Sequence, residues 1–140
     1  MVNNLTRRVD VFFYGLFMDE TLLQARGIEP QQRRLAVLEN FRLMIGERAT
    51  LIPSSGHIVH GVVFSLTHAE IDSLYAEASV GVYRPEAVMA RTPNRETVPA
   101  LCFNLPAPPL ATERNPQYAS KLKAVAVRIG LPDEYVETIK

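Results

Sequence analysis

The chain has 140 residues, and a chain of that size normally forms one domain that buries most of the surface its unfolded form would expose. Its 15 Lys and Arg residues balance its 15 Asp and Glu residues and no run of five like charges occurs, so it lacks the basic patch typical of proteins that bind nucleic acids or anionic membranes. A single cysteine, Cys102, excludes an internal disulfide framework, and its apolar surroundings predict a buried, unreactive thiol.

The chain begins with MVNNLTRR, which lacks the apolar core of a signal peptide. No window of the sequence approaches the roughly 20 apolar residues that span a bilayer. We therefore expect a soluble, cytoplasmic protein that binds neither membranes nor nucleic acid, and whose partner is a small molecule or another protein. The sequence contains no coiled-coil seam that would fix the oligomeric state, so both a monomer and a homodimer are compatible with it.

A strand is predicted over residues 9–14, VDVFFY, because valine and aromatic residues are enriched in strands. Gly15 ends this strand without a polar turn, and Asp19 can cap a short helix that follows. A glycine between a strand and a helix lets the backbone approach a ligand closely and directs several N–H groups to one point. The segment from Tyr14 to Phe17 is therefore a candidate site for an anion or an oxyanion, and a tight turn with a packed aromatic side chain is the alternative.

Two apolar stretches come next, residues 33–46 and residues 49–66, and both contain β-branched residues. Gly46, a turn signal over residues 53–56 and Gly61 interrupt them, so the pattern predicts two to four strands. Residues three apart on a strand point to opposite faces, so the two histidines of the second stretch do not predict a shared metal site.

A helix is predicted to begin at Thr67, because Thr67 and Glu70 have the spacing of a capping box. An apolar stripe continues along this helix and consists of Ile71, Leu74 and Tyr75. The cap and the stripe together predict that the helix runs to about Glu77.

The remaining segments predict a hairpin and two helices. Residues 83–92 and 95–105 have the composition of two strands joined by a short turn. A proline-rich connector then leads to Asn115, an N-cap followed by proline, and Gly130 ends the helix that begins there. A last short helix is predicted over residues 132–139.

These elements predict an α+β fold with about six strands in mostly antiparallel order, forming a small, partly closed sheet with helices inserted between and after the strands. They form a single domain over residues 1–140. The sequence contains no GxSxG elbow, no GxxxxGK[ST] loop, no GxGxxG and no CxxC. Chemistry is therefore left to the Tyr14–Phe17 segment and to the carboxylates.

Two stretches resemble the γ-glutamylcyclotransferase family. The first is Tyr14-Gly15 after an N-terminal strand, followed by a central helix that ends near a glutamate and by the strand that begins at Tyr83-Arg84. The second is NPQYASKLKAVAVRIGLPDEYVETI, which is similar to the closing segment of the animal γ-glutamylcyclotransferases, with Pro-Gln-Tyr, a helix and Gly-Leu-Pro-x-x-Tyr. The matches have the order of the family and span residues 11–139.

The resemblance implies a small mixed, barrel-like sheet with flanking helices, and a γ-glutamyl amino acid or amine as substrate, with no cofactor and no metal. In that reaction the α-amine of the substrate attacks its own γ-carbonyl, which forms 5-oxoproline and expels the other amine. A base must deprotonate the α-ammonium and the leaving amine must gain a proton, so one carboxylate can serve both steps. The resemblance points to Glu77 as this general acid/base.

The resemblance implies that six residues contact the substrate: Tyr14, Gly15, Leu16, Phe17, Tyr83 and Tyr118. Backbone N–H groups of the first segment would hold a carboxylate or the carbonyl oxygen, and the last two tyrosines would supply hydroxyl groups. Leu16 and Phe17 replace the Ser/Thr and Asn/Leu of the family motif, so the backbone donors remain and a side-chain hydroxyl is lost. Tyr83 and Tyr118 also fit an ordinary amphipathic pattern with the ring in the core.

The glutamate departs from the family spacing. The family helix usually reads Leu-Asp-x-x-Glu-Gly, whereas here Leu74 is followed by Glu77 at the third position and by Ala78 at the fourth. One residue on a helix is about 100° of rotation, which can turn a carboxylate away from a pocket. Counted back from Tyr83, however, Glu77 lies six residues upstream, near the usual distance in the family, so a slip at the helix end can restore its position.

Three hypotheses about the function follow from these observations. The first is a γ-glutamylcyclotransferase-like enzyme, with Glu86 as a second candidate carboxylate, since Asp19 and Glu20 are placed to cap a helix. The second is a non-catalytic relative that binds a small ligand and retains the Tyr-Gly loop, and the third is a structural or interaction domain in which this loop is only a turn. A buried Glu77 that faces the pocket favours the enzyme, whereas Glu77 in solvent favours the binding protein.

Overall fold

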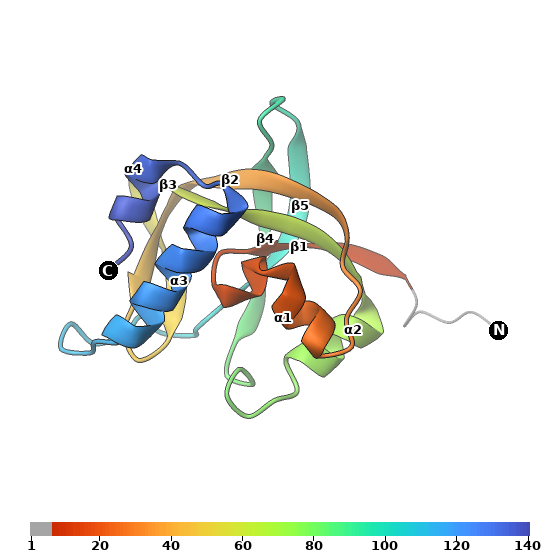
Figure 1. The fold of residues 1–140 in the computed structure, drawn as a ribbon, viewed down its shortest axis with the longest axis horizontal. Helices are drawn as coiled ribbons and strands as arrows, with labels where there is room; N and C mark the ends of the chain where they lie inside the picture. Colours follow the sequence, from red (N-terminus) through yellow and green to blue (C-terminus); the bar gives the residue numbers. More distant parts are fainter. Residues whose placement is uncertain (1–6) are drawn as a thin grey trace.

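Five strands close into a barrel in the computed structural model, which describes residues 7–140 (Figure 1). The strands are β1 (Arg8–Phe13), β2 (Gln31–Ile45), β3 (Ala49–Thr67), β4 (Arg84–Arg91) and β5 (Thr97–Asn104). They follow one another round the barrel in the order β1-β3-β2-β4-β5, and β1 closes it by pairing in parallel with β5. All other pairs are antiparallel, so the predicted α+β fold with a mixed, mostly antiparallel, barrel-like sheet is confirmed.

The expected count of about six strands was too high by one. The turn signal over residues 53–56 does not break the second apolar stretch, because these residues form a bulge inside β3. Opposite the bulge, the pairing jumps from Glu39–Ile58 to Phe41–Pro53, and the Gly56 N–H donates to the side-chain oxygen of Asn40 at 3.1 Å. Strand β3 thus continues through the local turn pattern, because the residues on both sides of it stay paired with β2.

The helices cover the barrel, and those with a predicted N-terminal capping residue begin directly after that residue. They are α1 (Glu20–Ala25), α2 (His68–Leu74), α3 (Pro116–Ile129) and α4 (Asp133–Glu137), with a short 3₁₀ turn, η2 (Leu16–Met18), before α1. Asp19 caps α1 by accepting from the Thr21 N–H at 3.0 Å, and Asn115 caps α3 in the same way. Helix α3 packs against η2 and α4, which places it over the chain that leaves β1 (Figure 1). Among residues 7–140, no helix is both long and apolar enough to cross a membrane.

Helix α2 is shorter than the sequence predicts and ends at Leu74 rather than near Glu77. Ile71 and Leu74 of its apolar stripe are buried. The chain from residue 75 to residue 83 then turns irregularly before β4 begins. Residues 1–6, which carry most of the segment from which the absence of a signal peptide is inferred, lie outside the described residues.

The predicted capping box at the start of α2 is present. Thr67 Oγ1 accepts from the Glu70 N–H at 3.1 Å, and the Glu70 carboxylate accepts from the Thr67 N–H at 2.8 Å. The second oxygen of Glu70 accepts from the Glu29 N–H at 2.8 Å, which joins α2 to the chain before β2. Burial acts to raise the pKa of Glu70, but the hydrogen bonds from Thr67 and Glu29 outweigh it and lower that pKa.

We expect Glu70→Gln to destabilise the protein at neutral pH, and this destabilisation to shrink in acid. A carboxyl group whose pKa is lower in the folded state stabilises the fold above its unfolded-state pKa, and this contribution is lost as the pH falls through the folded-state pKa. Urea midpoints of the two proteins, measured from about pH 7 down to about pH 3, should therefore converge. Asp72→Asn on the exposed face of α2 is the matched control, and the same convergence in that variant would contradict the prediction.

Candidate functional site

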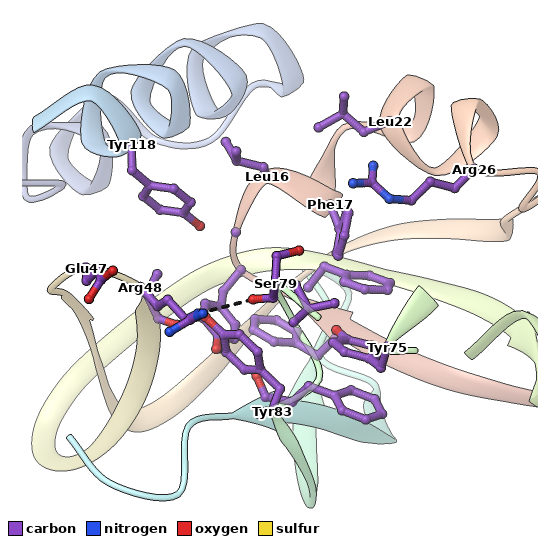
Figure 2. Close-up of a pocket in the computed structure, with 17 residues that line it drawn as sticks. Leu16, Phe17, Leu22, Arg26, Glu47, Arg48, Tyr75, Ser79, Tyr83 and Tyr118 are labelled. Atoms are coloured by element: carbon purple, nitrogen blue, oxygen red, sulfur yellow. Dashed lines mark hydrogen bonds between the residues drawn. The ribbon is translucent and has the colours of Figure 1, made fainter. Parts of the chain in front are cut away.

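A cavity of about 470 Å³ opens between η2, the β2–β3 turn, the 75–83 segment, β5 and α3 (Figure 2). Its volume falls in the range of small-molecule sites, roughly 300–1,000 Å³. Aromatic and aliphatic side chains form most of the wall. Its lining consists of Phe12, Phe13, Tyr14, Gly15, Leu16, Phe17, Leu22, Arg26, Glu47, Arg48, Ala49, Tyr75, Ser79, Val80, Tyr83, Phe103 and Tyr118.

The turn after β1 brings backbone N–H groups to the edge of this cavity. The first hydrogen bond of η2 runs from the Met18 N–H to the Gly15 carbonyl at 3.0 Å. The N–H groups of Gly15, Leu16 and Phe17 precede that bond and have no acceptor within the turn. The Leu16 amide lies against the Tyr118 hydroxyl, and all three residues line the cavity, where N–H groups of this kind can donate to a ligand.

The space around Gly15, rather than its backbone conformation, favours glycine at this position. Its φ of −109° and ψ of −154° are extended, which any residue can adopt. A Cβ atom at this position, however, would lie 2.7 Å from the Tyr118 hydroxyl oxygen. The glycine thus lets α3 place a hydroxyl group directly against the turn.

Two of the cavity tyrosines use their hydroxyl groups to hold the barrel. Tyr14 donates to the Phe103 carbonyl at 2.7 Å, and Tyr83 donates to the Ala49 carbonyl. Burial raises the pKa of both hydroxyls, and the nearby Arg48 guanidinium partly offsets this rise at Tyr83. These hydrogen bonds give both side chains a structural role in the cavity wall.

Tyr118 and Tyr75 supply the other two hydroxyl groups of the lining. Burial raises the pKa of each, so both stay protonated at neutral pH and can donate a hydrogen bond. The Leu16 amide lies against the Tyr118 hydroxyl and acts to lower its pKa, against the larger effect of burial. The Tyr75 ring stacks on Phe103 with centroids 3.9 Å apart and planes 14° from parallel.

Charged groups stand on two sides of the cavity (Figure 2). On one side Arg48 Nε donates to the Ser79 carbonyl at 3.1 Å, with Glu47 next to it at the β2–β3 turn. On the other side the Arg26 guanidinium carbon lies 5.1 Å from the centre of the Phe17 ring. Among residues 7–140, no group of three or more His, Cys, Asp or Glu side chains is placed to hold a metal ion.

Glu77 lies outside the lining of the cavity. Its side chain is 48% exposed and its carboxylate pairs with Arg26 at 3.3 Å. Ala78 is exposed as well, and the two residues that follow, Ser79 and Val80, contribute to the wall. The shortened α2 therefore leaves Glu77 beside the cavity on a turn, joined to it through Arg26.

The other candidate carboxylates have structural partners. Glu86 lies on β4 outside the lining and accepts from the Asn104 side chain at 3.0 Å. Asp19 caps α1 and also pairs with Arg128 at 2.6 Å, as its position at a helix start predicts. Cys102 is buried, and burial raises the pKa of its thiol to about 12, in agreement with the predicted unreactive thiol.

All six residues that the sequence places around a substrate line this one cavity: Tyr14, Gly15, Leu16, Phe17, Tyr83 and Tyr118. Sequence reasoning missed Arg26, Arg48 and Phe103, and assigned Tyr75 only to an apolar stripe. No local signal marks the two arginines, because nothing near them in the sequence indicates that they border a cavity. The stacking of Tyr75 on Phe103 joins residues 28 positions apart and is visible only in the fold.

Comparison with known proteins identifies a family. A family model described as "Gamma-glutamyl cyclotransferase, AIG2-like" matches residues 11–122, which is most of the chain. None of the curated proteins matches this sequence.

Several solved structures share the fold. A protein described as "Gamma-glutamyl cyclotransferase" superimposes with a TM-score of 0.80 at 23% identity, over 96% of this chain and 89% of the other. An uncharacterized protein from Homo sapiens has a TM-score of 0.79 at 23% identity, over 95% of this chain and 88% of the other. YkqA from Bacillus subtilis has a TM-score of 0.76 at 22% identity, over 94% of this chain and 52% of the YkqA chain. These similarities extend over almost the whole chain, and at this level of identity they establish the fold.

Proposed function

Because this chain belongs to the gamma-glutamyl cyclotransferase, AIG2-like family, we propose that its cavity binds the glutamyl part of a small γ-glutamyl compound. One observation carries the proposal: the N–H groups of the Gly15 turn, the Tyr118 hydroxyl and the Arg48 guanidinium all border the same largely apolar cavity. A glutamyl group carries a carboxylate and a carbonyl oxygen, and both accept hydrogen bonds from such donors. Among the functions that the family suggests, this binding is the one that the geometry supports best.

Cyclisation of the bound compound is the second candidate function. The α-nitrogen forms a bond to the γ-carbon, the bond from that carbon to the departing nitrogen breaks, and the products are 5-oxoproline and a free amine. Glu77 is the proposed base for the α-ammonium and the proposed acid for the departing nitrogen. Two facts favour it: the family and fold are of the γ-glutamyl cyclotransferase type, and Glu77 is joined to a cavity residue, Arg26.

The present position of Glu77 sets a condition on that chemistry. A general base must come within hydrogen-bond distance of the proton it removes, and Glu77 faces solvent instead. Its partner Arg26 is also partly exposed, and ion pairs of this kind contribute little to stability. Cyclisation through Glu77 thus requires the 75–83 turn to exchange this ion pair for a contact with the substrate.

We expect γ-glutamyl compounds to raise the melting temperature of both the native protein and Glu77→Gln, since ligand that binds only the folded state stabilises it. If Glu77 is the acid/base, only the native protein releases 5-oxoproline, because glutamine retains the shape of the side chain and cannot take the proton. The measurement is 5-oxoproline release and thermal stabilisation with γ-glutamyl amino acids, γ-glutamyl amines and glutathione.

Glu137→Gln is the matched control, because it makes the same change at an exposed carboxylate on α4 that is outside the cavity and is not a candidate acid/base. If a γ-glutamyl compound raises the melting temperature of the native protein but no 5-oxoproline is released, the protein binds the compound without cyclising it. The absence of both effects across the panel would refute the proposed function.

A further inference from the structure

The cavity has two chemically different sides, which meet where the Tyr75 and Tyr83 rings lie 6.4 Å apart (Figure 2). The polar side contains Arg48, the Ser79 backbone and Tyr118. The other side is aromatic and aliphatic, with a single cation, Arg26, at its edge. A ligand that spans both sides must therefore carry a polar end and an apolar end.

The apolar side is built around Phe17. Its ring meets Tyr75 edge to face at a centroid distance of 6.5 Å, and meets Phe13 edge to face at 6.2 Å. Leu22 from α1 lines the same side. Phe17 is only half-buried, so a ligand side chain placed against it would remove further apolar surface from water.

Arg26 is positioned to bind an anionic group next to this apolar wall. Its guanidinium lies over the Phe17 ring and forms an ion pair with the exposed carboxylate of Glu77 at 3.3 Å. An exposed ion pair is easily exchanged, since its net contribution is typically below about 1 kcal/mol. A carboxylate from a ligand can thus take the place of Glu77 on Arg26.

We propose that Arg26, Phe17 and Leu22 form a second subsite, which binds the residue attached to the γ-glutamyl group and selects an amino acid with a large apolar side chain. This inference rests on the proposed function. The two arginines on opposite sides of the cavity match the two carboxylates of a γ-glutamyl amino acid. A γ-glutamyl amine has only one of these carboxylates, and γ-glutamyl-glycine has no side chain to cover Phe17.

Three ligands test the subsite: γ-glutamyl-phenylalanine, γ-glutamyl-phenethylamine, which lacks the second carboxylate, and γ-glutamyl-glycine, which lacks the ring. Their dissociation constants are measured by titration calorimetry in the Glu77→Gln background. This substitution removes the Glu77 carboxylate, which is both the proposed base and the group that competes for Arg26. We expect γ-glutamyl-phenylalanine to bind on the order of tenfold more tightly than either other ligand. It should also bind more tightly to Glu77→Gln than to the native protein.

Adding Arg26→Gln should remove the preference for γ-glutamyl-phenylalanine over γ-glutamyl-phenethylamine, and should leave the affinity for the amine almost unchanged. Arg26→Lys retains the charge and should keep part of the preference. Arg42→Gln on the exposed surface of β2 removes the same charge outside the cavity and should change neither affinity. Melting temperatures confirm that each variant is folded.

The outcomes separate the subsite from the proposed function. Equal binding of all three ligands, or equal weakening of all three by Arg26→Gln, would refute the subsite and leave γ-glutamyl binding intact. Tighter binding of the amine than of the amino acid would also refute it. If none of the three binds to the native protein or to folded Glu77→Gln, the proposed function fails and the subsite fails with it.

Discussion

Substitution of Gly15 by valine is expected to abolish the binding of γ-glutamyl compounds and to leave the barrel folded. A Cβ atom at this position would approach the Tyr118 hydroxyl oxygen to 2.7 Å, so a side chain must displace either Tyr118 or the turn. Both carry donors proposed to hold the ligand. The backbone conformation at Gly15 is accessible to valine, so strain adds little to this effect.

The measurement is the dissociation constant of γ-glutamyl-phenylalanine for the two proteins, and we expect a loss on the order of 100-fold or more. Gly15→Ala made in the native protein and in Tyr118→Phe is the matched test of mechanism. Tyr118→Phe removes one proposed donor and also makes room for the added methyl group, so Gly15→Ala should weaken binding less in the Tyr118→Phe background than in the native protein. Unchanged binding by Gly15→Val would show that the turn is only a packed connection between β1 and α1.

The largest expected effect on stability comes from Gly61→Ala on β3. A Cβ atom here would contact the Phe13 backbone carbonyl and would lie 2.6 Å from Cζ of Phe12. The carbonyl cannot move without separating β1 from β3, which pair from residue 8 to residue 13. We therefore expect a loss of about 3 kcal/mol or more in the free energy of unfolding, read from urea denaturation.

Gly56→Ala on the same strand separates crowding from backbone strain. Gly56 has a φ of +83°, and a Cβ atom there would meet no atom within 4 Å. Alanine at this position should therefore cost only the strain of the left-handed conformation, roughly 1–2 kcal/mol. A loss at Gly61 equal to or smaller than the loss at Gly56 would show that the two strands adjust to the methyl group.

The sequence was most informative where a structure is determined by neighbours in the chain. The Thr67–Glu70 capping box, the Asp19 cap and the start and end of α3 were all predicted correctly, because each depends on hydrogen bonds that span three or four residues. The turn signal at residues 53–56 misled for the opposite reason. Pairing of both its flanks with β2 outweighed the local preference and turned it into a bulge.

The residues that line the cavity also fall into two groups, those that local sequence features mark and those that only the fold brings together. The glycine turn and its apolar neighbours are local features, and the sequence alone selected these residues, which line the cavity. The cavity itself depends on residues brought together by barrel closure, among them Arg48 from the β2–β3 turn and Phe103 from β5. No periodicity or cap relates these positions, so sequence reasoning did not select them.

The sequence by itself thus determined the fold class, most helix boundaries and the place of the glycine turn, since caps, periodicity and turn residues act over a few neighbouring positions. Only the tertiary structure decided where Glu77 points. Helix α2 ends at Leu74, and packing of the 75–83 turn directs Ser79 and Val80 to the cavity and leaves Glu77 with Arg26 in solvent. The rotation of about 100° per residue relates side chains only within a helix, so beyond Leu74 contacts with distant residues, rather than spacing, decide which side chain faces the cavity.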